Sequence, residues 1–180
     1  MYQILNIPEF AAEVVEQLGT KRKFWFYDGS GNKLLFKEGR PGTGENWAEK
    51  AASELCSLLE IPHAEYDLAA WKSYNGVVTP TFVPSGGRLV LGNELLQRFI
   101  TGYEKEKRFK QKQHTLMRAL IIAKNEKVEM PIDFKPDESI RSALDIFIGY
   151  LMFDAWIANQ DRHHENWGII VTTAQKLHLV

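Results

Sequence analysis

Hydrophobic and polar residues alternate in short runs over the first half of the chain. Residues 24–27 and 34–37 are apolar-rich runs of strand length, and the turn-forming cluster 28–32 separates them. Such a pattern predicts a β-hairpin. Further strand-like stretches cover residues 64–69, 76–83 and 88–91. We therefore expect a small antiparallel sheet in this half.

Helical spacing appears at two places between these runs. Residues 9–18 predict a short amphipathic helix that ends at Gly19, a favoured helix-terminating residue. Residues 45–60 predict a second helix, in which four apolar side chains recur at helical spacing and are expected to face a core: Trp47, Ala51, Leu55 and Leu58.

The pattern becomes helical from Leu95 onward. Residues 114–123 predict one helix, and the acidic pair at Asp137 predicts the start of a long one. An apolar stripe follows that long helix: Ile140, Leu144, Phe147, Ile148, Leu151 and Ala155. It ends at Asn159, and two short strands, 167–171 and 176–180, complete an α+β fold.

Composition narrows the class of protein. With 180 residues, a net charge of −1 and 44% hydrophobic residues, the chain fits one domain or a two-lobed unit. Neither a nucleic acid nor an anionic membrane is indicated as a partner. The only cysteine, Cys56, suits a reducing compartment, and the most apolar segment is too short to span a bilayer. We expect a cytoplasmic protein without a secretion signal.

The segment that carries chemistry reads N-Q-D-R-H-H-E-N-W-G over residues 159–168. Asp161 and Asn166 lie five positions apart on a loop between the long helix and a strand. The carboxylate of such an Asp orients or accepts the proton of an attacking hydroxyl, and the Asn side-chain oxygen holds a Mg²⁺ that bridges ATP phosphates. The spacing is similar to that of the catalytic loop of protein kinases, and this resemblance implies phosphoryl transfer.

Two other interpretations of this segment are open. A polar loop after a helix satisfies the last helical carbonyls and turns the chain without any chemistry. His163 and His164 with Glu165 or Asp161 would suit a metal, but adjacent histidines point in different directions and no third histidine has a supporting spacing. A zinc site is therefore disfavoured.

The order Asp161-Arg162-His163 with Asn166 three positions later, D-R-H-x-x-N, resembles HipA-like serine/threonine protein kinases and the phosphatidylinositol-kinase-related branch. The resemblance implies a kinase N-lobe over residues 1–97, with an antiparallel sheet and one helix, and a partial helical C-lobe over residues 98–180. It assigns nucleophile positioning to Asp161, loop support to His163 and the metal to Asn166.

The resemblance also assigns the residues that bind ATP. Lys37 is similar to the strand lysine that contacts the phosphates, and Glu49 to the acid that pairs with it. Glu54 lies on the same expected helix, but the family spacing favours Glu49. In a plain interpretation, Lys37 is a solvated strand end and Glu49 an exposed helix position. The remaining expected ATP contacts are the phosphate loop at Gly19 and Thr20 and the adenine-binding linker at Thr81, Phe82 and Val83. The implied cofactors are ATP and Mg²⁺.

What the resemblance implies about biology is a toxin of a bacterial toxin–antitoxin pair. The expected partners are an antitoxin and a protein substrate such as a translation factor or an aminoacyl-tRNA synthetase, without direct nucleic-acid or membrane contact. The family's metal-binding Asp motif, expected beyond Val180, is not in the sequence, so we expect a fragment with little activity alone. The alternatives are a non-catalytic nucleotide- or partner-binding module and a lipid or small-molecule kinase.

Two further segments have a chemical and a plain interpretation. The basic run of residues 105–112 has the spacing of a nucleic-acid contact, but interleaved glutamates favour a solvated connector. Residues 40–44 either cradle a phosphate at the start of a helix or simply cap it through Thr43 or Gly44.

Overall fold

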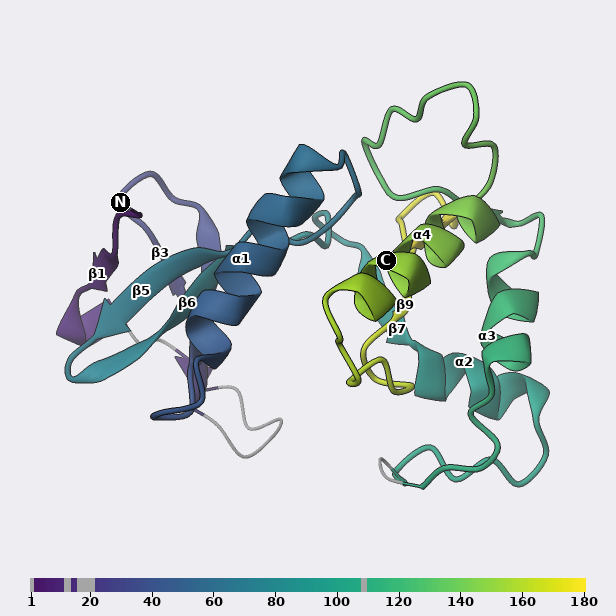
Figure 1. Cartoon of the computed structure of the whole chain (residues 1–180), viewed down its shortest axis with the longest axis horizontal. Helices are drawn as coiled ribbons and strands as arrows, with labels where there is room; N and C mark the ends of the chain where they lie inside the picture. The colour runs from purple at the N-terminus through teal and green to yellow at the C-terminus, as the bar shows by residue number, and fades with distance from the viewer. Residues whose placement is uncertain (1, 12–13, 16–21, 108–109) are drawn as a thin grey trace. The chain divides into compact units, whose positions relative to one another are not determined.

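The computed structural model of the chain describes residues 2–11, 14–15, 22–107 and 110–180. Contacts within the chain divide it into two compact units, Met1–Phe82 and Val83–Val180 (Figure 1). Gly19 and Thr20, the expected phosphate loop, lie outside the described residues.

The first unit is a six-stranded sheet with one long helix. The strands are β1 (Leu5–Ile7), β2 (Val14–Val15), β3 (Lys23–Tyr27), β4 (Lys33–Glu38), β5 (Asp67–Trp71) and β6 (Tyr74–Pro80), and their order is β1-β5-β6-β4-β3-β2. All pairings are antiparallel except that of β1 with β5. The 3₁₀ turn η1 (Glu9–Ala11) and helix α1 (Glu45–Leu58) complete the unit.

The predicted hairpin is confirmed as β3 and β4. The carboxylate of Asp28 accepts the backbone N–H groups of Ser30 and Asn32 and so closes the turn. Phe24 and Phe36 are paired in register across the two strands, and their rings lie 5.1 Å apart. Both side chains are almost wholly buried, so the hairpin supplies the centre of the sheet's apolar core.

The side of α1 that packs inward differs from the sequence expectation. Trp47 and Leu58 are 63% and 79% exposed, whereas Lys50, Ser53 and Cys56 are buried. The inward side is set by short side chains and by an ion pair of Lys50 with Asp67 at 2.9 Å, rather than by large apolar residues.

The predicted helix over 9–18 is wrong. Glu9–Ala11 is a 3₁₀ turn, and Val14–Val15 pairs with β3, as β-branched residues favour.

The second unit combines a four-stranded sheet with three helices. The strands are β7 (Arg88–Leu91), β8 (Val128–Glu129), β9 (Gly168–Val171) and β10 (Leu177–Leu179), in the order β7-β9-β10-β8. The helices are α2 (Gly92–Phe99), α3 (Leu116–Ala123) and α4 (Ala143–Trp156). Because β7 pairs with β9, it belongs to the second unit, and the units divide after Phe82. The lobe boundary expected from the sequence lies after residue 97.

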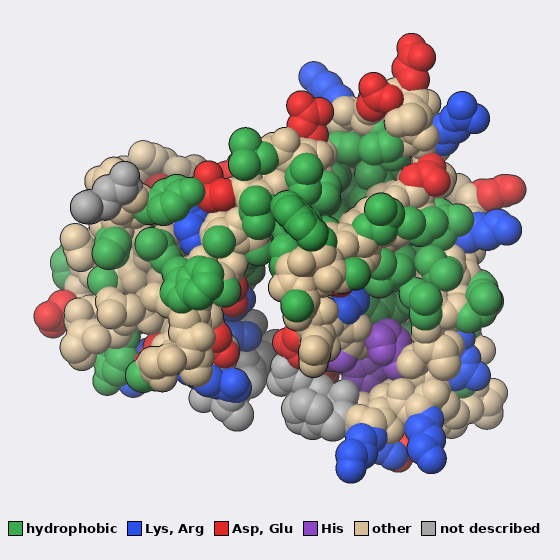
Figure 2. All heavy atoms as spheres, viewed as in Figure 1, with side chains coloured by type: hydrophobic (Ala, Val, Ile, Leu, Met, Phe, Trp, Pro, Cys, Tyr) green, Lys and Arg blue, Asp and Glu red, His purple; other side chains and the backbone are tan. Residues whose placement is uncertain are grey.

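Helix α4 begins later than expected. Ser142 and Asp145 form a reciprocal capping box, so that the helix starts at Ala143, while Asp137 accepts the N–H of Ser139 in a preceding turn. Phe147 packs into the core, but Met152 and Trp156 are 68% and 64% exposed. Hydrophobic side chains accordingly gather on the visible face of this unit in Figure 2. None of the helices in the described ranges is long and apolar enough to cross a membrane.

Gly76 lies where β6 approaches β4 closely. A Cβ atom there would collide with the Lys37 carbonyl oxygen, whereas a Cβ at Gly29 would meet nothing within 4 Å. We expect Gly76→Ala to lower the free energy of unfolding by about 1–3 kcal/mol and Gly29→Ala to change it little. Urea titration of both variants measures the difference. Equal stability of the two would contradict this packing.

Candidate active site

In the first unit an ion pair forms beside the sheet. The ammonium of Lys37, near the end of β4, donates to both carboxylate oxygens of Glu49 on α1, at 2.9 and 3.0 Å. Its third contact is the hydroxyl of Tyr66 at 3.4 Å. Glu54 instead pairs with Lys50. Of the two candidate acids, Glu49 is therefore the one that pairs with Lys37.

Tyr66 is the member of this cluster that sequence reasoning missed. Its backbone N–H donates to the buried hydroxyl of Ser53 at 3.1 Å, which ties the start of β5 to α1. No local spacing marks Tyr66, because it meets Lys37 only through the sheet register. Three contacts from two residues, Glu49 and Tyr66, restrict where the Lys37 amine can reach.

The charge of Lys37 is also set by this cluster. Burial alone favours the neutral amine, but the oxygens of Tyr66 and Glu49 outweigh it and raise the pKa of Lys37 above its ordinary value. Burial raises the pKa of the Tyr66 hydroxyl, against the opposing effect of Lys37. At neutral pH the pair is therefore an ammonium beside a neutral phenol, suited to an anionic ligand.

In the second unit a buried ion pair anchors the loop after α4. The carboxylate of Asp154 is buried and accepts from Arg162 Nε at 2.6 Å and Nη2 at 2.9 Å. Asn159 donates to the same carboxylate at 2.8 Å. Ala158 has a left-handed backbone, φ 56°, and the N–H of Asn159 returns to the Asp154 carbonyl at 2.8 Å. This is a Schellman-type helix end, and it fixes where the loop departs.

The same arginine continues to the far end of the loop. Arg162 Nη1 donates to the Asn166 carbonyl at 3.2 Å. The Asn166 amide nitrogen donates to the Asp161 backbone carbonyl and, at 3.1 Å, to its carboxylate. His163 donates its backbone N–H to the Asp161 carbonyl at 2.9 Å. Asp161, His163 and Asn166 thus form one cluster.

The cluster has the oxygens that Mg²⁺ prefers. With its amide nitrogen turned toward Asp161, Asn166 directs its oxygen away, and both side chains are exposed. Within the described part of the chain, no group of three His, Cys, Asp or Glu side chains is arranged for a metal. Mg²⁺ commonly takes one or two protein oxygens and completes its shell with substrate phosphates and water, so Asn166 and Asp161 fit a nucleotide-borne ion.

The expected adenine contacts follow β6. Thr81 donates its N–H to the Lys33 carbonyl at 3.1 Å, and Phe82 is 45% exposed. Val83 begins the second unit, so the three residues connect the units in sequence. Their contact with adenine stays a prediction.

Histidines of the second unit lie close to the loop. His164 is fully buried, and its Nδ1 is 2.6 Å from the hydroxyl of Tyr103. Burial raises the pKa of Tyr103 to about 12, so it is a neutral phenol. The indole N–H of Trp167 donates to His114 Nε2 at 3.2 Å. These contacts hold the loop's second histidine inside the unit.

Comparison with known proteins identifies the fold. No protein-family model matches the chain, and no curated protein does. The structure resembles the proinflammatory kinase CtkA of Helicobacter pylori, with a TM-score of 0.71 and 18% identity over 99% of this chain and 58% of CtkA. It also resembles HipA of Shewanella oneidensis, solved with HipB and operator DNA, with a TM-score of 0.61 and 15% identity over 93% of this chain and 43% of HipA.

These likenesses define a class. The chain has the α+β, kinase-like fold of HipA-like kinases. It spans about half the length of the two solved kinases, 58% and 43%. The sequence resemblance to this class is therefore confirmed at the level of fold.

Removing Arg162 tests the buried ion pair. Arg162→Ala leaves the Asp154 carboxylate buried without its partner, and we expect a loss of about 3–5 kcal/mol in the free energy of unfolding. Arg162→Lys keeps the charge but cannot form the two parallel hydrogen bonds, so we expect it to be more stable than Arg162→Ala and less stable than the unchanged protein. Arg98→Ala, at an exposed position of α2, is the matched control. Urea unfolding measures all three, and a loss no larger than that of the control would contradict the anchoring role.

We expect acid to destabilise the second unit through its histidines. Burial lowers the pKa of His114 and of His164, and His163 adds to both effects. Unfolded histidines titrate near a pKa of about 6.5, so below this pH the unfolded chain binds protons that the folded chain does not. Stability is therefore expected to fall as the pH drops from about 7.5 to about 5.5.

Urea unfolding at the two pH values checks this expectation. His114→Gln should reduce the difference in stability between the two pH values. Stability that is constant or greater at the acid pH would show that these histidines are not held neutral.

Proposed function

We propose that the chain carries the ATP-binding and catalytic-loop parts of a HipA-like serine/threonine protein kinase that uses ATP and Mg²⁺. The observation that carries the proposal is the Asp161–Asn166 cluster on a loop anchored by Asp154 and Arg162. The kinase-like fold supports it, and so does the Lys37–Glu49 pair of the first unit. A polar loop without chemistry would not need this degree of order.

Each residue has a distinct proposed role. The exposed carboxylate of Asp161 orients the substrate hydroxyl and accepts its proton, and His163 supports that carboxylate, with Nε2 at 3.5 Å from Oδ1. The Asn166 oxygen holds Mg²⁺, which when bound neutralises the charge of the transferring phosphate. Lys37 binds the nonbridging phosphate oxygens, and Glu49 with Tyr66 positions its amine.

The remaining assignments follow the same kinase frame. Gly19 and Thr20 would cover the phosphates, and Thr81, Phe82 and Val83 would contact adenine. The substrate would be a protein, of the kind represented by translation factors or aminoacyl-tRNA synthetases, in the cytoplasm. The HipA neighbour is solved with HipB and operator DNA, which supports an antitoxin as a partner.

Transfer of labelled γ-phosphate to a protein substrate or to the kinase itself tests the proposal, in this chain and in any longer polypeptide that contains it. Asp161→Asn keeps the size but removes the carboxylate, and we expect a loss of about 100-fold or more in rate. Lys37→Met should weaken ATP binding and transfer by a similar factor, because it removes the phosphate contact.

Matched controls separate these effects from general damage. Gln160→Ala changes the neighbour of Asp161, and Lys33→Met removes another lysine of β4; both should retain activity. ATP binding without transfer in every polypeptide would favour a non-catalytic module. Transfer to lipids or small molecules, but not to proteins, would favour that class of kinase instead.

A further inference from the structure

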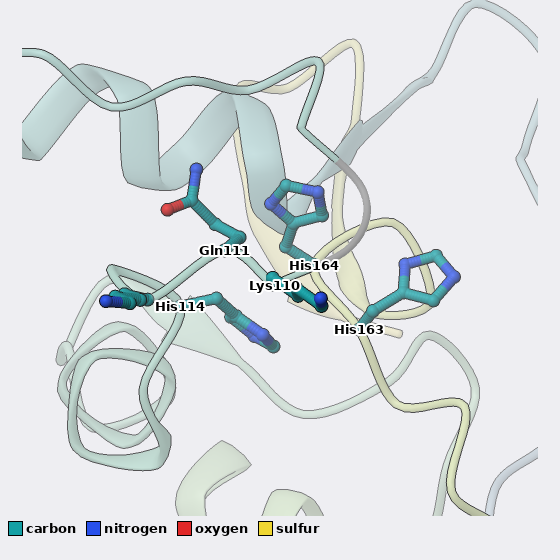
Figure 3. A pocket seen from close by; sticks show the side chains of 6 residues that line it. Lys110, Gln111, His114, His163 and His164 are labelled. Atoms are coloured by element: carbon teal, nitrogen blue, oxygen red, sulfur yellow. The ribbon is translucent and has the colours of Figure 1, made fainter.

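A pocket of about 440 Å³ lies beside the candidate catalytic loop in the second unit (Figure 3). Its lining comes from the segment before α3 and from the loop after α4: Lys110, Gln111, Lys112, His114, His163 and His164. Lys110 and Lys112, which belong to the basic run that the sequence suggested as a solvated connector, therefore line a hollow next to the loop. Of the lining residues, only His163 has a role in the proposed phosphoryl transfer.

Hydrogen-bond accounting assigns the tautomer of His164. The hydroxyl of Tyr103 is 2.6 Å from His164 Nδ1, and Tyr103 is itself buried. If Nδ1 carried the proton, the Tyr103 hydroxyl hydrogen would have no acceptor among the described residues. The hydroxyl therefore donates to Nδ1, and Nε2 carries the ring proton. That buried Nε2–H has no partner among the described residues.

The same reasoning orients the other two imidazoles. His114 Nε2 accepts from the Trp167 indole, so the His114 ring proton is on Nδ1. His163 Nδ1 accepts the backbone N–H of Glu165 at 3.2 Å, so its Nε2 proton faces the Asp161 carboxylate. His114 and His164 thus each carry a ring N–H, on Nδ1 and on the buried Nε2, and both residues line the pocket, whereas the N–H of His163 is directed to Asp161.

Charge at the pocket is positive. Lys110 and Lys112 are exposed, and neither forms an ion pair in the part of the chain that the structure describes. In Figure 3 the Lys110 side chain extends toward the side of the pocket where His163 lies. The acidic groups nearby are Asp161 and Glu165, and both have partners of their own. Two cations and two residues that carry an imidazole N–H therefore line one hollow, which is the donor set that suits an oxyanion.

We propose that this pocket binds the carboxylate or phosphate of a substrate residue that flanks the hydroxyl to be phosphorylated. The inference rests on the proposed kinase function. His163 connects the two places, because its ring lines the pocket and its Nε2 is 3.5 Å from Asp161 Oδ1. A substrate chain that presents a hydroxyl to Asp161 therefore passes the pocket, which selects acidic or phosphorylated neighbours of that hydroxyl.

Binding without ATP tests the site independently of transfer. The chain is labelled with ¹⁵N-histidine, and the His164 Nε2 signal is followed during titration with three probes. These are a serine peptide with three flanking glutamates, the same peptide with glutamines, and inorganic phosphate. We expect the glutamate peptide to shift Nε2 and to bind about tenfold more tightly than the other two.

Substitution of the lysines shows whether the pocket is responsible. Lys110→Gln with Lys112→Gln should weaken the glutamate peptide by about tenfold, and more salt should weaken it further. Lys124→Gln with Lys127→Gln removes the same charge from exposed positions elsewhere in this unit and should have little effect. Both double variants change only exposed side chains, so folding should be retained.

Three results would overturn the inference. Equal binding of the glutamate and glutamine peptides would remove the anion preference. Phosphate binding as tight as that of the glutamate peptide would make the pocket a free-anion site. If both double lysine variants bound the glutamate peptide equally weakly, the effect would come from the overall charge and not from the pocket. Asp161→Asn should abolish transfer yet keep peptide binding, so failure of the kinase proposal is seen separately.

Discussion

The arrangement of the loop after α4 depends on one buried carboxylate. Asp154 interrupts an otherwise apolar helix end, where an isolated charge would be strongly unfavourable. Arg162 offsets that cost with two parallel hydrogen bonds, and in doing so it fixes the path of the intervening residues. Because Arg162 also reaches the Asn166 carbonyl, helix end and loop end are joined through one side chain.

Each unit has an ion pair, and the two pairs differ in burial and in what they position. The Asp154–Arg162 pair positions backbone, and its charges are satisfied within the loop. The Lys37–Glu49 pair is more open to solvent, and its ammonium keeps its charge through Glu49 and Tyr66. Such an amine can bind a phosphate. Asp161 and Asn166 are exposed as well, as their proposed contacts with a substrate hydroxyl and a metal require.

Local pattern predicted part of this correctly. The β3–β4 hairpin followed from two apolar runs and the Asp28 turn, and the D-R-H-x-x-N spacing pointed to a kinase-like fold. The errors were at positions where packing outweighs periodicity. Trp47 had helical spacing yet faces solvent, because short side chains and an ion pair decide which side of α1 packs.

Sequence spacing could not predict contacts between residues that are far apart along the chain. Tyr66 meets Lys37 across 29 residues, and Tyr103 meets His164 across 61. Asp154 was visible only as a break in an apolar segment, although its partner Arg162 lies inside the recognised motif. An acidic residue within an apolar helical segment, eight positions before an arginine, is a sequence signal that could have indicated this pair.

The central claim, that Asn166 on the anchored loop holds the metal of a bound nucleotide, is tested most directly by crystallography. The chain, or a longer polypeptide that contains it, would be crystallised with a nonhydrolysable ATP analogue and Mn²⁺ in place of Mg²⁺. The account predicts an anomalous peak within bonding distance of Asn166 Oδ1, between that oxygen and the nucleotide phosphates. A nucleotide bound with its metal away from Asn166 would contradict it.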